Sequence, residues 1–331
     1  MQRIHGLLIA SSATLPGLPH VAATRPADVH LELTERALES PRSPLRPLYQ
    51  TQIDPWDPSD PTLTVALDSR GIVCFRYSDG TAIDVSLDRG AARITARIAP
   101  GQILEDLTTY LYGAVLGFVL RTRGVLAMHA SCVADDEGAI LLVGHSGAGK
   151  STTAASLHRG GWRVLSDDLT ALSAPAPSGG PWLAHSAFSH VRLWPTSEPI
   201  VLGAAGVLGR ITPSWDKLRY PLDAGSFGDD GVPVRGIFVI HPREDSDDAP
   251  RASDDEAAPQ RLLTLATMTY ANYLHDARTR AIELQQLGGL LRDVPVRTLV
   301  AHRDPTRIGA LCELIEREAR AMRAAGSLAA R

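Results

Sequence analysis

The segment Gly144–Ser151, with the sequence GHSGAGKS, constrains this chain more than any other feature. It matches the pattern G-x-x-x-x-G-K-S/T in full, follows the apolar run Ala139–Val143 and precedes a helical pattern over Ser151–His158. A glycine-rich loop between a buried strand and a helix turns successive backbone N–H groups toward phosphate oxygens. We therefore predict a phosphate-binding P-loop in an α/β fold, with a purely structural glycine-rich turn as the alternative.

Within this loop, single residues have predicted roles in binding ATP and Mg²⁺. The Lys150 ammonium is expected to reach the β- and γ-phosphates, and the Ser151 hydroxyl is expected to ligate Mg²⁺. Lysine occurs only at Lys150 and Lys217, which makes both candidates, because arginine does not replace lysine where the geometry is tight. The residues predicted to contact the nucleotide are Gly144, Ser146, Gly147, Ala148, Gly149, Lys150, Ser151 and Thr152.

Two adjacent carboxylates, Asp167 and Asp168, end the next apolar strand, Trp162–Ser166. If this strand and the strand before the P-loop are neighbours, one carboxylate can hold Mg²⁺ while the other accepts a proton. A solvated turn is the alternative for this pair. His129 lies just before the strand that leads to the P-loop, where it is either functional or a hydrogen-bonded core residue.

The pattern along the chain predicts two parts. Leu63–Ile98 alternates apolar and polar residues between turn signals, which favours a meander of antiparallel strands, whereas the proline-rich stretch Val21–Pro61 favours loop. Glu105–Arg121 has the length and apolar content of a helix, and apolar runs alternate with helical stretches from Val125 onward. We predict a β-rich N-terminal domain over residues 1–100 and a P-loop domain over residues 101–331.

Composition excludes several partners. The 331 residues are 44% hydrophobic and carry a formal net charge of −4, so neither nucleic acid nor an anionic membrane is expected as a partner. The short apolar run at the N-terminus, Leu7–Ala10, predicts a strand and not a signal peptide. The three cysteines show no disulfide or metal-binding spacing, and we expect a cytoplasmic protein.

At these motifs the chain resembles the HPr kinase/phosphorylase family. The resemblance rests on His129, the loop Gly144–Ser151 and the strand that ends at Asp167-Asp168, within residues 125–170. Phosphoenolpyruvate carboxykinases share the loop and a similar Asp-Asp segment. Beyond this region, the segment Val191–Pro195 and Lys217 look like a branch of HPr-kinase-like proteins found beside peptide-modifying enzymes, some of which phosphorylate a serine of a lasso peptide. The implied fold is a P-loop kinase domain of the HPr-kinase/carboxykinase type.

This resemblance implies roles for four residues. Asp167 would be the general base that takes the proton of the acceptor hydroxyl, with His129 assisting. Asp168 would join Ser151 around Mg²⁺.

Two further residues, Lys217 and Arg192, are expected to contact phosphate or acceptor.

The chain also departs from the family, because His190-Val191-Arg192 stands where the regulatory kinases carry a metal-binding glutamate. The glycine-rich C-terminal segment that those kinases use toward HPr is not found, so HPr is not the expected acceptor.

The sequence thus predicts a Mg-ATP-dependent kinase that acts on a serine hydroxyl of a peptide or small protein. Two alternatives remain open: a lyase similar to phosphoenolpyruvate carboxykinase, and a nucleotide-binding regulator without catalysis. The sequence also leaves open the identity of the acceptor and a reverse phosphorylase reaction. It leaves open the oligomeric state, including a homo-oligomer.

Overall fold

The computed structural model describes residues 1–51, 62–88, 90–188, 190–202, 209–211, 216–222, 231–241, 249–274, 276–302 and 304–329. The chain forms two compact units. The first comprises Met1–Val119 with Ala271–His275, and the second comprises Leu120–Tyr270 with Asp276–Arg331. The division that the sequence predicts, between residues 100 and 101, lies earlier in the chain, because the first helices after residue 100 belong to the first unit.

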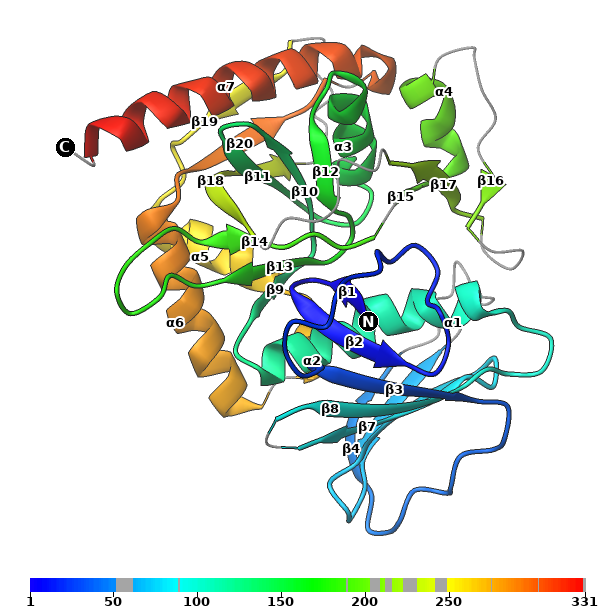
Figure 1. The fold of residues 1–331 in the computed structure, drawn as a ribbon. Helices are drawn as coiled ribbons and strands as arrows, with labels where there is room; N and C mark the ends of the chain where they lie inside the picture. Colours follow the sequence, from blue (N-terminus) through cyan, green and yellow to red (C-terminus); the bar gives the residue numbers. More distant parts are fainter. Residues whose placement is uncertain are drawn as a thin grey trace. The chain divides into compact units, whose positions relative to one another are not determined.

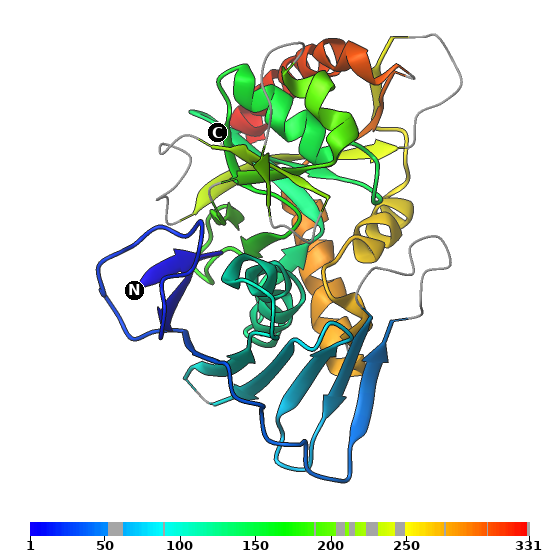
Figure 2. The same ribbon diagram turned by 90° about the vertical axis from the view of Figure 1, so that its right-hand side faces the viewer.

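In the first unit, the described residues build a sheet with the strand order β1-β2-β3-β8-β7-β6-β5-β4. In Figure 2 these strands, coloured blue to cyan, lie side by side. Strands β5 to β8 are antiparallel neighbours in chain order, which confirms the predicted meander. The strands are β1 (Gln2–Ile4), β2 (Leu7–Ser11), β3 (Val29–Thr34), β4 (Arg46–Gln50), β5 (Leu63–Leu67), β6 (Val73–Tyr77), β7 (Ala82–Leu87) and β8 (Ala92–Arg97).

The expectation of loop over residues 21–61 is wrong for β3 and β4. Strand β3 runs parallel to β8, with Val29 opposite Ala92, and it buries Val29 and Leu31 between exposed residues. Strand β4 pairs antiparallel with β5. Pro26 precedes β3 and Pro47 lies within β4, and pairing with partners remote in the sequence overrides the local signal. Residues 52–61 lie outside the described part of the chain.

The predicted helix over residues 105–121 is an interrupted one. It consists of α1 (Leu104–Tyr110), a π-helical turn (Leu111–Val115) and α2 (Leu116–Thr122). Gly113 has non-helical backbone angles and marks the interruption.

In the second unit, the central sheet contains the strand path β12-β10-β11-β18-β14-β13-β9, with β20 beside β18 and β19 beside β20. A small sheet of order β15-β17-β16 accompanies it. The strands are β9 (Leu126–Met128), β10 (Ala130–Asp135), β11 (Gly138–Val143), β12 (Arg163–Ser166), β13 (Thr170–Ser173), β14 (Leu183–Ala184), β15 (His190–Leu193), β16 (Gly209–Arg210), β17 (Leu218–Pro221), β18 (Val232–His241), β19 (Arg251–Ser253) and β20 (Val296–Val300).

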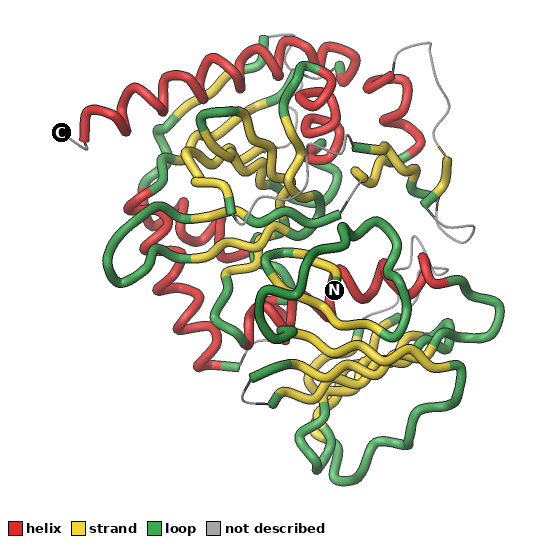
Figure 3. Tube along the Cα trace, viewed as in Figure 1, coloured by secondary structure: helices red, strands yellow, loops and turns green. Residues whose placement is uncertain are grey.

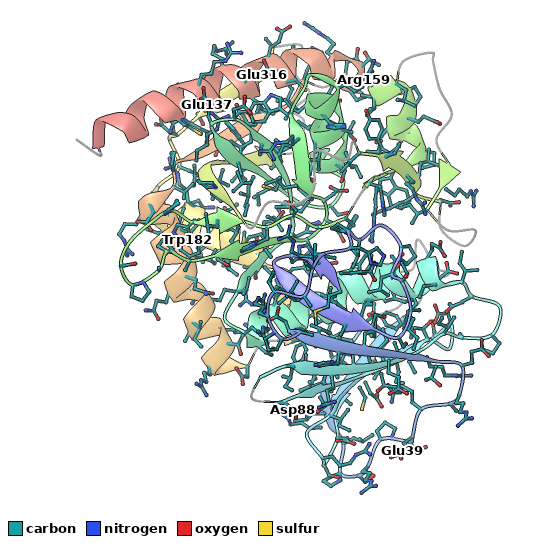
Figure 4. All side chains as sticks on the ribbon, in the orientation of Figure 1. Glu39, Asp88, Glu137, Arg159, Trp182 and Glu316 are labelled. Atoms are coloured by element: carbon teal, nitrogen blue, oxygen red, sulfur yellow. The ribbon has the colours of Figure 1, made fainter. Side chains whose placement is uncertain are left out.

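Helices cover both faces of this sheet, and Figures 1 and 3 show its strands between them. Side chains of β11 alternate between the two faces, so that Ile140 and Leu142 pack with α3 and α7 while Leu141 and Val143 pack with α5 and α6. On the second face, the Trp182 indole (labelled in Figure 4) donates to Asp293 of α6 over 3.0 Å. The helices are α3 (Lys150–Arg159), α4 (Glu198–Leu202), α5 (Ala258–Thr267), α6 (Ala277–Asp293) and α7 (Ile308–Ala329), with single 3-10 turns at Pro195–Ser197 and Pro305–Arg307. A further 3-10 turn, Asn272–Leu274, belongs to the first unit.

The structure therefore confirms a mixed α/β fold with several sheets. The narrower expectation of a P-loop kinase fold stays a prediction. Within the ranges given above, every helix is too short or too polar to cross a bilayer.

A buried ion pair between Arg121 and Glu283 joins α2 to α6, with the two side chains 3% and 6% exposed. Replacing Arg121 by methionine leaves a buried carboxylate without its cation, and we expect a loss of about 3–5 kcal/mol in the free energy of unfolding. Urea denaturation measures this loss. The double variant Arg121→Met/Glu283→Leu should recover most of the stability, and a loss under about 1 kcal/mol in the single variant would contradict the account.

Candidate functional site

The loop between β11 and α3 has the backbone that its glycines allow. Gly147 and Gly149 adopt left-handed φ values of 79° and 92°, and Gly149 immediately precedes the first residue of α3. Gly144 lies against β18, where a Cβ atom would be 2.6 Å from the Ile240 carbonyl oxygen. The loop thus lies at the carboxyl end of β11, and its last residues lead into the positive end of a helix dipole.

The side chain of Lys150 is buried beneath this loop. Its ammonium donates to the carbonyl oxygens of Gly144, over 2.8 Å, and His145, over 3.1 Å. Burial lowers the pKa of Lys150, and the two carboxylates nearby oppose that shift. Carbonyl dipoles therefore hold the Lys150 ammonium at the loop. Phosphate oxygens are stronger acceptors than those carbonyl oxygens.

A second buried group, the Asp167 carboxylate, connects three segments of the site. One oxygen accepts from the Ser151 hydroxyl over 2.8 Å and from the Ser131 hydroxyl over 2.6 Å. The other accepts from the Arg192 backbone N–H over 3.0 Å. Asp167 is 1% exposed, so its oxygens are occupied by the protein and turned away from solvent.

Sheet topology explains how Asp167 reaches the loop. Strands β11 and β12 are not neighbours, since β10 lies between them and pairs antiparallel with both. Two strands that are each antiparallel to β10 run in the same direction, so their carboxyl ends share one edge of the sheet. Ser131 of β10 fills the gap, and the sequence interpretation missed it because nothing near it in the chain marks its role.

Asp168 lies in a different environment, although it follows Asp167 directly. Its backbone has a left-handed φ of 70°, which is rare for a residue with a side chain. One oxygen accepts from the Tyr270 hydroxyl over 3.1 Å, and the other lies 3.3 Å from His129 Nδ1. The Asp168 side chain is 26% exposed.

Charge around Asp168 controls its titration. Burial acts to raise its pKa, but positive charge from His129, and then from Arg192 and Lys217, holds the pKa below its ordinary value. For His129, burial is the larger effect and lowers the pKa, although the nearby Asp168 carboxylate favours the charged ring. His129 is therefore neutral at pH 7. The strand end that carries it is fixed by a bond from its backbone N–H to the Met268 carbonyl over 2.7 Å.

A cavity of about 390 Å³ brings most of the predicted site residues together. Lys150, Arg192 and Lys217 supply positive charge to it, against one exposed carboxylate, Asp168. Of the predicted residues, Gly144, Ala148 and Asp167 are not part of the lining. The lining residues are His129, Ser146, Gly147, Gly149, Lys150, Ser151, Thr152, Asp168, Arg192, Leu193, Trp194, Thr196, Ser197, Ile200, Lys217 and Pro305.

The structure adds residues that the sequence interpretation missed. Tyr270 holds Asp168, and Trp194 lines the cavity with 52% of its surface exposed. Thr152 donates to the Ser197 hydroxyl over 2.9 Å, which fixes the start of α3 against the turn that precedes α4.

The Ser151 side-chain oxygen, which suits Mg²⁺, lines the cavity, and the Asp167 carboxylate lies directly behind it. Mg²⁺ prefers oxygen ligands and takes one or two carboxylates together with water and phosphate oxygens. Among the residues with described side chains, no group of three or more His, Cys, Asp or Glu could hold a metal ion without such additional ligands. The residues present fit a magnesium ion that a bound triphosphate helps to ligate.

A second cavity of about 390 Å³ lies on the α5 side of the loop. Gly144 and His145 line it together with the end of β18 and residues of α5. Among the described residues that line it there is no lysine or arginine, so it lacks the charge that a phosphate chain requires.

No protein-family model matches the chain, and a search of curated proteins returned no significant match. The resemblance to HPr-kinase-like proteins therefore stays a prediction from the motifs.

The close approach of Gly144 to β18 gives a test of the loop. In Gly144→Ala the new methyl group meets the Ile240 carbonyl, so the loop must shift and its N–H groups lose their alignment. We expect binding of inorganic tripolyphosphate to weaken at least tenfold, measured by calorimetry. Gly288→Ala in α6 is a control for substitution of a glycine, because its Cβ would meet nothing within 4 Å and its backbone is helical. Unchanged binding by Gly144→Ala would contradict the assignment of phosphates to this loop.

Proposed function

We propose that this protein is a kinase that transfers the γ-phosphoryl group of Mg-ATP to a hydroxyl group. The observation that carries the proposal is one cavity in which the loop 144–151, the cations Arg192 and Lys217, and the pair Asp168–His129 lie together. Phosphoryl transfer needs positioned reactants and compensation of charge, and these residues supply both.

In this proposal the nucleotide binds by its phosphate chain. The N–H groups of the loop and the start of α3 donate to β-phosphate oxygens, and Lys150 exchanges its carbonyl partners for phosphate oxygens. Mg²⁺, when bound with ATP, neutralises charge that develops on the phosphate oxygens. Ser151 lines the cavity and would hold the ion, and the buried Asp167 carboxylate accepts from the Ser151 hydroxyl and keeps its oxygen in place.

The proton of the acceptor hydroxyl goes to Asp168 in our proposal, which is opposite to the role that the family resemblance implies. Asp168 lines the cavity with its side chain 26% exposed, whereas Asp167 is 1% exposed and both of its oxygens accept hydrogen bonds from the protein. The hydroxyl oxygen attacks the γ-phosphorus, the bond from that phosphorus to the β–γ bridging oxygen breaks, and ADP leaves with the bond electrons. The His129 ring is hydrogen-bonded to the main-chain carbonyl of Asp168, and the Tyr270 hydroxyl donates to its carboxylate, so together they keep Asp168 in place.

The nature of the acceptor, a serine of a peptide or small protein, rests on the family resemblance alone. A carboxykinase-like lyase and a non-catalytic regulator remain the alternatives. They differ in outcome, since the lyase would transfer phosphate to or from a carboxylic acid substrate and the regulator would bind ATP without turnover.

Comparing Asp167→Asn with Asp168→Asn tests the division of roles. If Asp168 is the base, Asp168→Asn should bind Mg-ATP normally while the single-turnover rate falls by about 10²–10⁴. Asp167→Asn should raise the Mg²⁺ concentration needed for half-maximal binding. The assay follows transfer from γ-labelled ATP to synthetic peptides that contain one serine. The reverse pattern would restore Asp167 as the base.

Lys150→Met is the control for the whole proposal. It should abolish binding of ATP and of tripolyphosphate, because the only buried lysine of the loop is lost. Binding of either compound with wild-type affinity would remove the basis of the kinase proposal. Tight ATP binding by the wild type without transfer to peptides or acids would favour the regulator.

The lowered pKa of His129 predicts the pH dependence. Burial disfavours the charged ring, so the pKa of His129 lies below its ordinary value and the ring is protonated only at lower pH. Protonation then pairs the ring with Asp168 and makes that carboxylate a weaker base. We expect kcat/KM to stay constant from pH 7.5 to 6.5 and to fall at lower pH, with this fall absent in His129→Gln. A fall centred above pH 6.5 in the wild type would contradict this assignment.

A further inference from the structure

Two cations of the cavity are held by aromatic rings. The Arg192 guanidinium carbon lies 4.9 Å from the centre of the Phe188 ring, and Lys217 Nζ lies 5.2 Å from the centre of the Trp194 ring. The second contact follows from strand pairing. Leu193 of β15 is opposite Leu218 of β17, so the next positions along this antiparallel pair are Trp194 and Lys217.

Neither cation forms a salt bridge with any carboxylate in the described part of the chain. A carboxylate would fix an ammonium group and cancel its charge. An aromatic ring fixes it through the negative face of the π-system and leaves its full charge available to a ligand. Lys217 lines the same cavity as Lys150 and Asp168, and its charge acts on both of them.

We propose that Trp194 is a positioning residue, whose ring holds Lys217 as an uncompensated cation directed at the phosphate chain of the nucleotide. This inference rests on the proposed function, since it requires a phosphate chain in the cavity. Tryptophan is the strongest π-donor among the aromatic residues, and its exposed position here permits replacement without loss of the core. Phe188 is buried, so replacing it would also disturb the packing around it.

A double-mutant cycle tests the role. The variants are Trp194→Leu, Lys217→Met and the combination of both, with Trp194→Phe as the conservative replacement. Affinities for Mg-ATP and for inorganic tripolyphosphate with Mg²⁺ are measured by calorimetry. We expect Trp194→Leu to weaken both ligands equally, by about 3- to 10-fold, and Trp194→Phe to lose less than about 2-fold. In the Lys217→Met background, Trp194→Leu should have no further effect.

A control and three outcomes complete the design. Leu284→Ala, an exposed apolar truncation on α6, should leave both affinities unchanged. A loss for ATP but not for tripolyphosphate would overturn the proposal in favour of a stacked nucleobase. An equal loss with and without Lys217 would overturn it in favour of direct contact. If the wild type binds neither compound, the proposed function falls as well, whereas either of the two preceding outcomes, with wild-type binding intact, removes only the role of Trp194.

Discussion

The rest of the site depends on the hydrogen bonds to one buried carboxylate. Asp167 accepts from Ser131 of β10, from Ser151 of α3 and from the backbone of Arg192 in β15. Charge-assisted hydrogen bonds of this kind are about twice as strong as neutral ones, and a buried carboxylate without them is costly. The loop, the helix that follows it and the small sheet that carries the cations are therefore fixed around one group.

Around this fixed centre, positive charge is left open to a ligand. Within the described part of the chain, Lys150 hydrogen-bonds to carbonyl oxygens alone, and aromatic rings support Arg192 and Lys217. These partners direct the cations without neutralising them. A cavity built in this way favours a ligand with several negative charges, and a triphosphate with Mg²⁺ matches it.

Local signals explain what the sequence could predict. Glycine spacing indicates the strand, the loop and the helix at 139–159. Strands β3 and β4 escaped prediction because their partners are distant in the sequence. The same holds for Tyr270 and Ser131, which reach the site by tertiary packing. The two carboxylates are adjacent in the chain, and only the left-handed backbone of Asp168 separates their environments.

The most direct test of the account is hydrogen exchange of the backbone amides with and without Mg-ATP. The account predicts slower exchange at residues 146–151, with the same protection when tripolyphosphate replaces ATP, because the loop N–H groups donate to phosphate oxygens. Protection that is confined to the second cavity, along α5 and the end of β18, would contradict it, as would unchanged exchange at 146–151 under saturating nucleotide.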